Sequence, residues 1–271
     1  MSKFYCFILS ILMLLQMCVF VHPTEQVYAD GFNGSTYLYT EQESISYYRK
    51  EESEVNLSGG LPKYYSTFSN PNDCAPVAGS IVLGYFDRKF DQLIPNFTAG
   101  RYIRDQFIYT PQNDTIVNLT NTLYNLMDTN TSGNGTAINQ FKNGLQEYVQ
   151  SKGRTIAYSS VMNGSLSVQE VIDSINSGNP IVIFVVGYAL VSASSINSTT
   201  YVDTFHKDIY GGAHTMIVSG VKIVTYYNQT GGVVDSKILL NVASGYRENG
   251  VCYMMLNAYG NLDDAYSVKI N

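Results

Sequence analysis

The hydrophobic pattern changes after Asn179-Pro180, and this change limits the folds open to the chain. Before it, apolar residues recur at helical spacing, whereas after it they run continuously or alternate, as they do in strands. The expected helices begin near Cys74 and at Thr115 to Met127, Thr136 to Ser151 and Ser167 to Asn176, and the expected strands are Ile181 to Val186, His214 to Ile223, Lys237 to Ala243, Val251 to Asn257 and Ala265 to Ile270. The sequence therefore predicts an α+β fold, with a helical half packed on an antiparallel sheet half.

Residues 1–29 have the pattern of a secretory signal peptide. Lys3 gives a positive start, Ile8 to Val21 is apolar, and Val27 and Ala29 supply small residues at the cleavage site. A membrane-spanning helix needs about 20 apolar residues, more than this segment has. We expect cleavage after Ala29 and an exported protein with no remaining membrane span. An uncleaved membrane anchor is the alternative.

The rest of the chain divides into a short arm and one domain. Residues 30–60 are polar, Tyr-rich and interrupted by Gly and Ser, without a sustained helical or strand period. This pattern predicts an irregular arm or a short pro-segment. About 240 residues follow the signal peptide, enough for one sizeable core or a two-lobed unit, and residues 61–271 form the expected domain.

The charge of the chain and the spacing of its Cys and His residues limit the partners and metals that we expect. The chain has 16 basic and 22 acidic residues, and its Lys and Arg residues form no cluster of the kind that binds nucleic acid. Spacings such as Cys-x-x-Cys or His-x-x-x-His are missing from the sequence. We therefore expect no nucleic-acid partner, metal or cofactor.

Cys74 is the expected nucleophile. It heads a predicted helix that Asn72 or Asp73 can cap, and a helix N-terminus favours a thiolate. Cys252 is the other cysteine that remains after the signal peptide, and it lies in an apolar strand that suits a small buried side chain. A disulfide between Cys74 and Cys252 in an extracellular binding module is the alternative.

His214 is the expected general base. It follows Gly-Gly-Ala and heads an alternating strand, whereas His206 lies in a polar stretch that predicts a solvated loop. His214 lies 140 residues after Cys74, within the window of about 130 to 150 residues known for papain-like enzymes. We expect the two side chains to form a thiolate–imidazolium pair.

A third residue must orient the imidazole ring. Asn241 lies on the next expected strand, where its amide oxygen can accept the second ring proton of His214; Asp235 is the alternative. The oxyanion site needs the backbone N–H of Cys74 and a side-chain donor upstream, for which the candidates are Ser69, Asn70 and Asn72.

Three segments resemble the bacterial bacteriocin-processing-peptidase-like family of the papain clan. The family's nucleophile helix is similar to the run NDCAPVAG at 72–79, continued by LGYFDR at 83–88 and LIP at 93–95. Its histidine strand is similar to GAHTMIVSG at 212–220, and LLN at 239–241 occupies the place of its Asn/Asp strand. The resemblance covers most of the chain from Leu61 to Ile270.

The resemblance implies a papain-like fold with Cys74, His214 and Asn241 as catalytic residues. Family members usually carry a Gln upstream of the nucleophile, and residues 61–73 contain none. Transporter-linked members cleave double-glycine leaders, but this chain has no transporter domain. We expect a monomeric, secreted thiol protease that hydrolyses peptide or protein substrates through a Cys74 thioester. An acyltransferase or amidase, and a non-catalytic extracellular module on a degenerate peptidase fold, remain alternatives.

Overall fold

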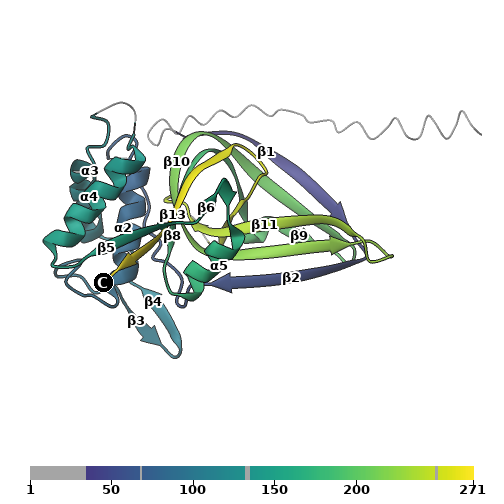
Figure 1. Cartoon of the computed structure of the whole chain (residues 1–271), viewed down its shortest axis with the longest axis horizontal. Coiled ribbons are helices and arrows are strands. Elements are labelled where there is room, and N and C mark those ends of the chain that lie inside the picture. Colours follow the sequence, from purple (N-terminus) through teal and green to yellow (C-terminus); the bar gives the residue numbers. More distant parts are fainter. Residues whose placement is uncertain (1–34, 68, 132–134, 248–249) are drawn as a thin grey trace, which may run out of the picture.

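The computed structural model describes residues 35–67, 69–131, 135–247 and 250–271 (Figure 1). The expected signal peptide lies outside the described residues. The helices are α2 (Cys74–Asp87), α3 (Asp114–Leu126), α4 (Ile138–Ser151), α5 (Val168–Asn176) and the short η1 (Ala193–Ser195). The strands are β1 (Ser35–Ser46), β2 (Arg49–Asn56), β3 (Gly100–Ile103), β4 (Gln106–Tyr109), β5 (Ile156–Ser160), β6 (Met162–Asn163), β7 (Ser165–Leu166), β8 (Ile181–Ser192), β9 (Ile196–Ser198), β10 (Val202–Tyr227), β11 (Val233–Ala243), β12 (Cys252–Met255) and β13 (Asn261–Ile270).

The strand β10 organises the molecule. It is 26 residues long and pairs antiparallel with β1, β2, β8, β9 and β11. Since β11 pairs with β12, and β12 pairs with β8, the pairings among β8, β10, β11 and β12 close into a ring. The strands β13 and β5 extend the sheet beyond β8. A nine-stranded antiparallel sheet results.

The predicted papain-like α+β fold is wrong. Strands make up 44% of the structure and helices 23%, and no helix-led half is evident in the described residues. Helices α2, α3 and α4 gather at one end, but β13 and β5 reach into that end as well (Figure 1). The helices therefore cover one end of a dominant sheet. The helices and strands expected after residue 74 are present, with other boundaries. The largest shift is in β10, which begins at Val202, so the expectation that His214 heads its strand is wrong.

The largest error concerns the arm before residue 61. It was expected to be irregular, yet β1 and β2 contribute 12 and 8 residues to the sheet. Most of their side chains are at least partly exposed, so the alternating apolar signal of a half-buried strand is missing. Their partner β10 lies far along the chain, with Ser35 opposite Gly212 and Arg49 opposite Tyr227. This segment forms two strands because it pairs with β10, and local sequence pattern cannot predict such a long-range pairing.

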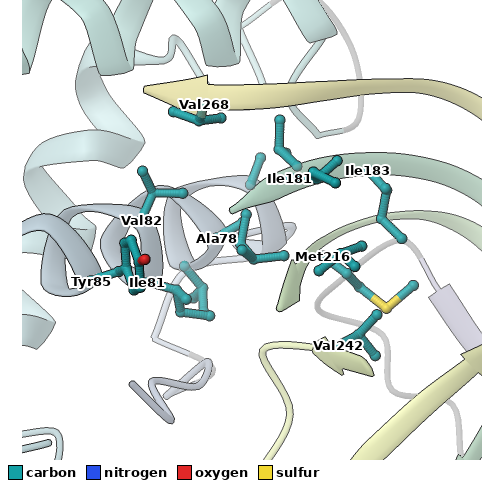
Figure 2. Close-up of a cluster of buried hydrophobic side chains, with 14 of the residues drawn as sticks. Ala78, Ile81, Val82, Tyr85, Ile181, Ile183, Met216, Val242 and Val268 are labelled. Carbon is teal, nitrogen blue, oxygen red and sulfur yellow. The ribbon is translucent and has the colours of Figure 1, made fainter. Parts of the chain in front are cut away.

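Helix α2 is the buried helix that positions Cys74. Every residue from Ala75 to Asp87 is buried, and Pro76 lies in the first turn, where its missing N–H costs no hydrogen bond. Figure 2 shows Ala78, Ile81 and Val82 of α2 facing side chains of β8, β10, β11 and β13, among them Ile183, Met216, Val242 and Val268. The sheet therefore covers one side of α2, and Gly79 on α2 lies against Leu123 of α3 and Leu145 of α4.

A second, smaller core lies around the first part of β10 and contains a buried carboxylate. Its apolar members include Ile45, Phe205 and Tyr226. Asp203, only 2% exposed, accepts hydrogen bonds from Lys50 Nζ at 2.8 Å, Tyr226 Oη at 2.9 Å and Tyr47 Oη at 3.1 Å. Lys50 also forms an ion pair with Asp203, so the buried charge is neutralised locally.

Across the described ranges, none of the helices has the length and apolar character needed to cross a membrane.

Candidate active site

Cys74 and His214 line the same cavity, which has a volume of about 160 Å³. Cys74 begins α2, and His214 lies near the middle of β10, opposite Val185 of β8. The fold thus brings together two residues that are 140 positions apart in the sequence. The other side chains around the cavity include Asn72, Thr136, Phe184, Val185, Thr215 and Asp263.

The thiol of Cys74 is free and only partly exposed. Cys252 is also a free cysteine and is buried, so the alternative disulfide is not formed. Burial raises the pKa of the Cys74 thiol to about 11, with hydrogen bonding to Thr215 opposing the shift and the nearby Asp73 carboxyl adding to it. Cys74 therefore carries its proton at neutral pH.

His214 is held in one tautomer. Its ring nitrogen Nε2 lies 2.7 Å from the carbonyl oxygen of Ser244. A carbonyl oxygen can only accept a hydrogen bond, so Nε2 must carry the proton. The other nitrogen, Nδ1, is buried and has no hydrogen-bond partner among the residues that the structure describes. In the neutral ring, Nδ1 therefore offers an unused lone pair.

Aromatic side chains keep water away from His214. The His214 ring stacks on Tyr188 at 5.3 Å and on Tyr246 at 5.0 Å between ring centroids. Burial lowers the pKa of His214 to about 4, against the opposing effect of its hydrogen bond to Ser244. Burial thus favours the neutral forms of both Cys74 and His214, which argues against the expected thiolate–imidazolium pair. Loss of solvation on both groups is the cause.

The structure does not bring Asn241 to His214. Asn241 Nδ2 donates to Asn56 Oδ1 at 3.0 Å, and the residue lines a separate cavity of about 720 Å³. Asp235 forms an ion pair with Lys237 at 3.0 Å and also lies outside the Cys74 cavity. The backbone carbonyl of Ser244 holds the ring instead. Sequence reasoning missed it because a backbone acceptor depends on strand register and leaves no signal in residue type.

Of the three candidate oxyanion donors, Asn72 alone lines the cavity. Asn72 has φ of 57°, a left-handed conformation, and its Nδ2 donates to Asn130 Oδ1 at 2.8 Å. Asn70 donates instead to Asn121 at 2.7 Å, and Ser69 bonds to Thr67 at 3.0 Å. Asn72 is therefore the one of the three candidates that lies at the Cys74 cavity.

A short network connects the Cys74 segment with the turn that holds His214. Ser66 Oγ donates to Asp73 Oδ2 at 2.8 Å, and the Ser66 backbone N–H donates to the carbonyl of Gly245 at 2.9 Å. Gly245 follows directly on Ser244, the partner of the His214 ring. Asp73 makes no side-chain cap at α2, contrary to the expected helix cap, because its carboxyl group turns to Ser66. Burial raises the pKa of Asp73 to about 6, against the hydrogen bond from Ser66.

His206 lies outside the site. It was expected in a solvated loop but lies in β10, opposite Gln42 of β1. Its Nε2 is 3.3 Å from Asn197 Nδ2, and it does not line the Cys74 cavity. The loop prediction is wrong because the inward-facing residues on this part of β10 include Asp203 and Lys207, which hide the alternation of a strand.

Among the described residues, no three His, Cys, Asp or Glu side chains gather as metal ligands do. The chain matches no family model, and no curated protein matches it either. The chemistry of the cavity must therefore be argued from its own residues.

Proposed function

We propose that the protein is an exported cysteine peptidase in which Cys74 attacks the peptide carbonyl and His214 is the general base. The observation that carries this proposal is the shared cavity of Cys74 and His214, combined with the unused Nδ1 lone pair of His214. An imidazole whose Nε2–H is fixed by a carbonyl has the tautomer that a base facing a thiol requires.

The neutral pair supports a stepwise proton transfer. As the Cys74 sulfur bonds to the substrate carbonyl carbon, the thiol proton moves to Nδ1 of His214. The tetrahedral intermediate then expels the amine, which takes the proton back from the imidazolium, and a thioester remains on Cys74. Water, deprotonated by His214, then attacks the thioester carbon. The C–S bond breaks, the acid leaves, and the Cys74 sulfur takes the proton from the imidazolium.

Two neighbouring groups support these steps. The carbonyl of Ser244 fixes the ring and stabilises the imidazolium while it exists, the orienting role that the sequence had assigned to Asn241. In this proposal the backbone N–H of Cys74 and the side-chain amide of Asn72 donate to the oxyanion, which is supported by the position of both residues at the cavity.

Export rests on the sequence of residues 1–29 alone. Lys3, the apolar run to Val21 and the small residues before Asp30 support a cleaved signal peptide. N-terminal sequencing of protein from the culture medium tests this part, and we expect the mature chain to begin at Asp30.

An electrophilic peptide probe for cysteine peptidases tests the catalytic part. The wild-type protein and a Cys252→Ala variant should both be labelled, and mass spectrometry should locate the probe on Cys74. The Cys74→Ala variant should bind none. A probe found only on Cys252, or equal peptide hydrolysis by wild type and Cys74→Ala, would rule out the proposal.

A further inference from the structure

Among the described residues that line the cavity around Cys74, Asp263 is the one that carries a carboxylate. The nearby carboxyl group of Asp73 is buried and hydrogen-bonded to Ser66. His214 is neutral near pH 7 because burial lowers its pKa to about 4, and Cys74 is neutral as well. The remaining lining residues are uncharged except Asp263. A carboxylate beside two neutral reacting groups makes the cavity attractive to cations.

A β-bulge places Asp263 at the cavity. In the pairing of β13 with β8, Leu262 lies opposite Val185 and Asp264 lies opposite Phe184, so Asp263 is the extra residue between them. Both Val185 and Phe184 line the cavity. A bulge bends its strand and re-aims a side chain, and bulges are frequent beside active sites.

The carboxyl group of Asp263 is available to a ligand. Asp263 is exposed, and it makes no hydrogen bond or ion pair with any residue in the ranges that the structure describes. Its neighbour Asp264, by contrast, accepts hydrogen bonds from the Ala265 backbone and from Tyr266. Asp263 therefore has no structural partner within the described fold to compensate its charge.

We propose that Asp263 makes the Cys74 cavity selective for substrates with a cationic group close to the reacting carbonyl. The inference rests on the proposed peptidase function. A cavity of about 160 Å³ is smaller than the roughly 300 Å³ at which sites for drug-sized ligands begin, so it accepts one side chain or a chain end. The cation is an ammonium or guanidinium group, supplied by a Lys or Arg side chain or by a free α-amino group.

Charged thiol reagents test the electrostatic effect of Asp263 on reactions at Cys74 without any peptide substrate. In the Cys252→Ala background, Cys74 is the only thiol in the described residues. We would compare its reaction with a trimethylammonium-ethyl and a sulfonato-ethyl methanethiosulfonate, which differ in charge at similar size. Asp263→Asn should lower the ratio of cationic to anionic rate by about tenfold.

A matched variant controls for the general charge of the protein. Asp105 is also an exposed aspartate, but it lines a different cavity, next to Tyr102 and Phe107. Asp105→Asn should leave the rate ratio unchanged within about twofold, since distant exposed charges are screened. A ratio at Cys74 that Asp263→Asn does not change, or that Asp105→Asn changes equally, overturns the inference.

A peptide library then distinguishes a cationic side chain from a free α-amino group. It also tests the cationic preference separately from the peptidase function. Cleavage sites read by mass spectrometry should be enriched in Lys or Arg, or in residues near a free N-terminus, and N-terminal acetylation should remove only the latter. Asp263→Asn should abolish the enrichment. Cys74-dependent cleavage without cationic preference overturns the inference and leaves the peptidase function standing, whereas cleavage that persists in Cys74→Ala rejects the function itself.

Discussion

The strand β10 carries two buried polar sites that are built in opposite ways. Near its start, Asp203 accepts hydrogen bonds from Lys50, Tyr47 and Tyr226. Near its middle, His214 has one partner for Nε2 and, within the described part of the chain, none for Nδ1. One site satisfies its charge within the protein, and the other keeps a lone pair unused.

The pKa values of both groups lie below their ordinary values, which favours the charged form of Asp203 but the neutral form of His214. Burial alone would raise the pKa of Asp203, but hydrogen bonds from Lys50, Ser198 and Tyr226 bring it below its ordinary value, which favours the charged carboxylate. Burial lowers the pKa of His214 to about 4, and the single bond to Ser244 does not offset it. A buried polar group without a hydrogen-bond partner costs about 1–3 kcal/mol of stability. We therefore interpret Asp203, whose carboxylate has partners, as a structural residue, and His214, whose Nδ1 stays without one, as a residue kept for catalysis.

The largest expected effect is on catalysis at His214. His214→Ala should lower peptide turnover by about a thousandfold, because general-base catalysis contributes about 10²–10⁴. His206→Ala, on the same strand but outside the cavity, should change turnover by less than about twofold. Both variants should show wild-type circular dichroism. Equal losses in the two variants would remove the special role of His214.

Asp203→Ala should mainly affect stability. Removing the carboxylate leaves the partly buried Lys50 without its main partner and should lower the free energy of unfolding by about 3 kcal/mol in urea titrations. Asp208→Ala, an exposed site on the same strand that accepts from Thr40 at 2.7 Å, should change it by less than about 1 kcal/mol.

The same carboxylate should make stability depend on pH. Because the folded pKa of Asp203 lies below its unfolded value, its contribution is present above about pH 4 and is lost as the pH falls through the folded pKa. Asp203→Ala should therefore be less sensitive to acid than wild type between about pH 5 and pH 2. Parallel acid-unfolding curves for the two proteins would argue against a structural role for this charge.

The alkylation of Cys74 should reveal a neutral thiol. With the pKa of Cys74 raised to about 11 by burial, iodoacetamide should react roughly a hundredfold more slowly at pH 8 than with an ordinary cysteine of pKa about 8.5. The rate should rise about tenfold for each pH unit between pH 7 and pH 10. The Cys252→Ala background isolates the signal. A rate that is already at its plateau at pH 6 would instead support the thiolate–imidazolium pair of Cys74 and His214.

Ser66→Ala should break the hydrogen-bonded connection between Asp73, which precedes Cys74, and the turn at Gly245. It removes the hydrogen bond to Asp73 but keeps the Ser66 backbone contact with Gly245. We expect kcat to fall about tenfold with little change in KM, because the loss affects geometry rather than substrate binding. Ser66→Thr retains the hydroxyl and should restore most of kcat. A loss in both variants that follows their thermal stability would indicate packing alone.

Asn241→Ala should have the smallest effect. Its amide bonds to Asn56 and not to His214, so turnover should fall by less than about threefold. Asn56→Ala is the matched control and should behave in the same way. A loss of about a hundredfold in Asn241→Ala alone would return Asn241 to the orienting role.

Local pattern was enough to find the helix that begins at Cys74, the later helices and the strand that contains His214. It failed where the partner was distant or the inward face was polar. The segment before residue 61 becomes β1 and β2 because β10 pairs with them. The stretch around His206 is a strand whose buried face holds Asp203 and Lys207, each neutralised by opposite charges from β1 or β2.

The sequence by itself determined which residues can do chemistry: two cysteines after the expected signal peptide, one of them at a helix start, and one histidine at the head of an apolar run. Only the tertiary structure decided their state. Burial beside Tyr188 and Tyr246 made His214 neutral, strand register chose the carbonyl of Ser244 over Asn241, and a bulge added Asp263 to the cavity. Solvation, register and bulges depend on residues brought together from distant parts of the chain, and these are properties that no local pattern contains.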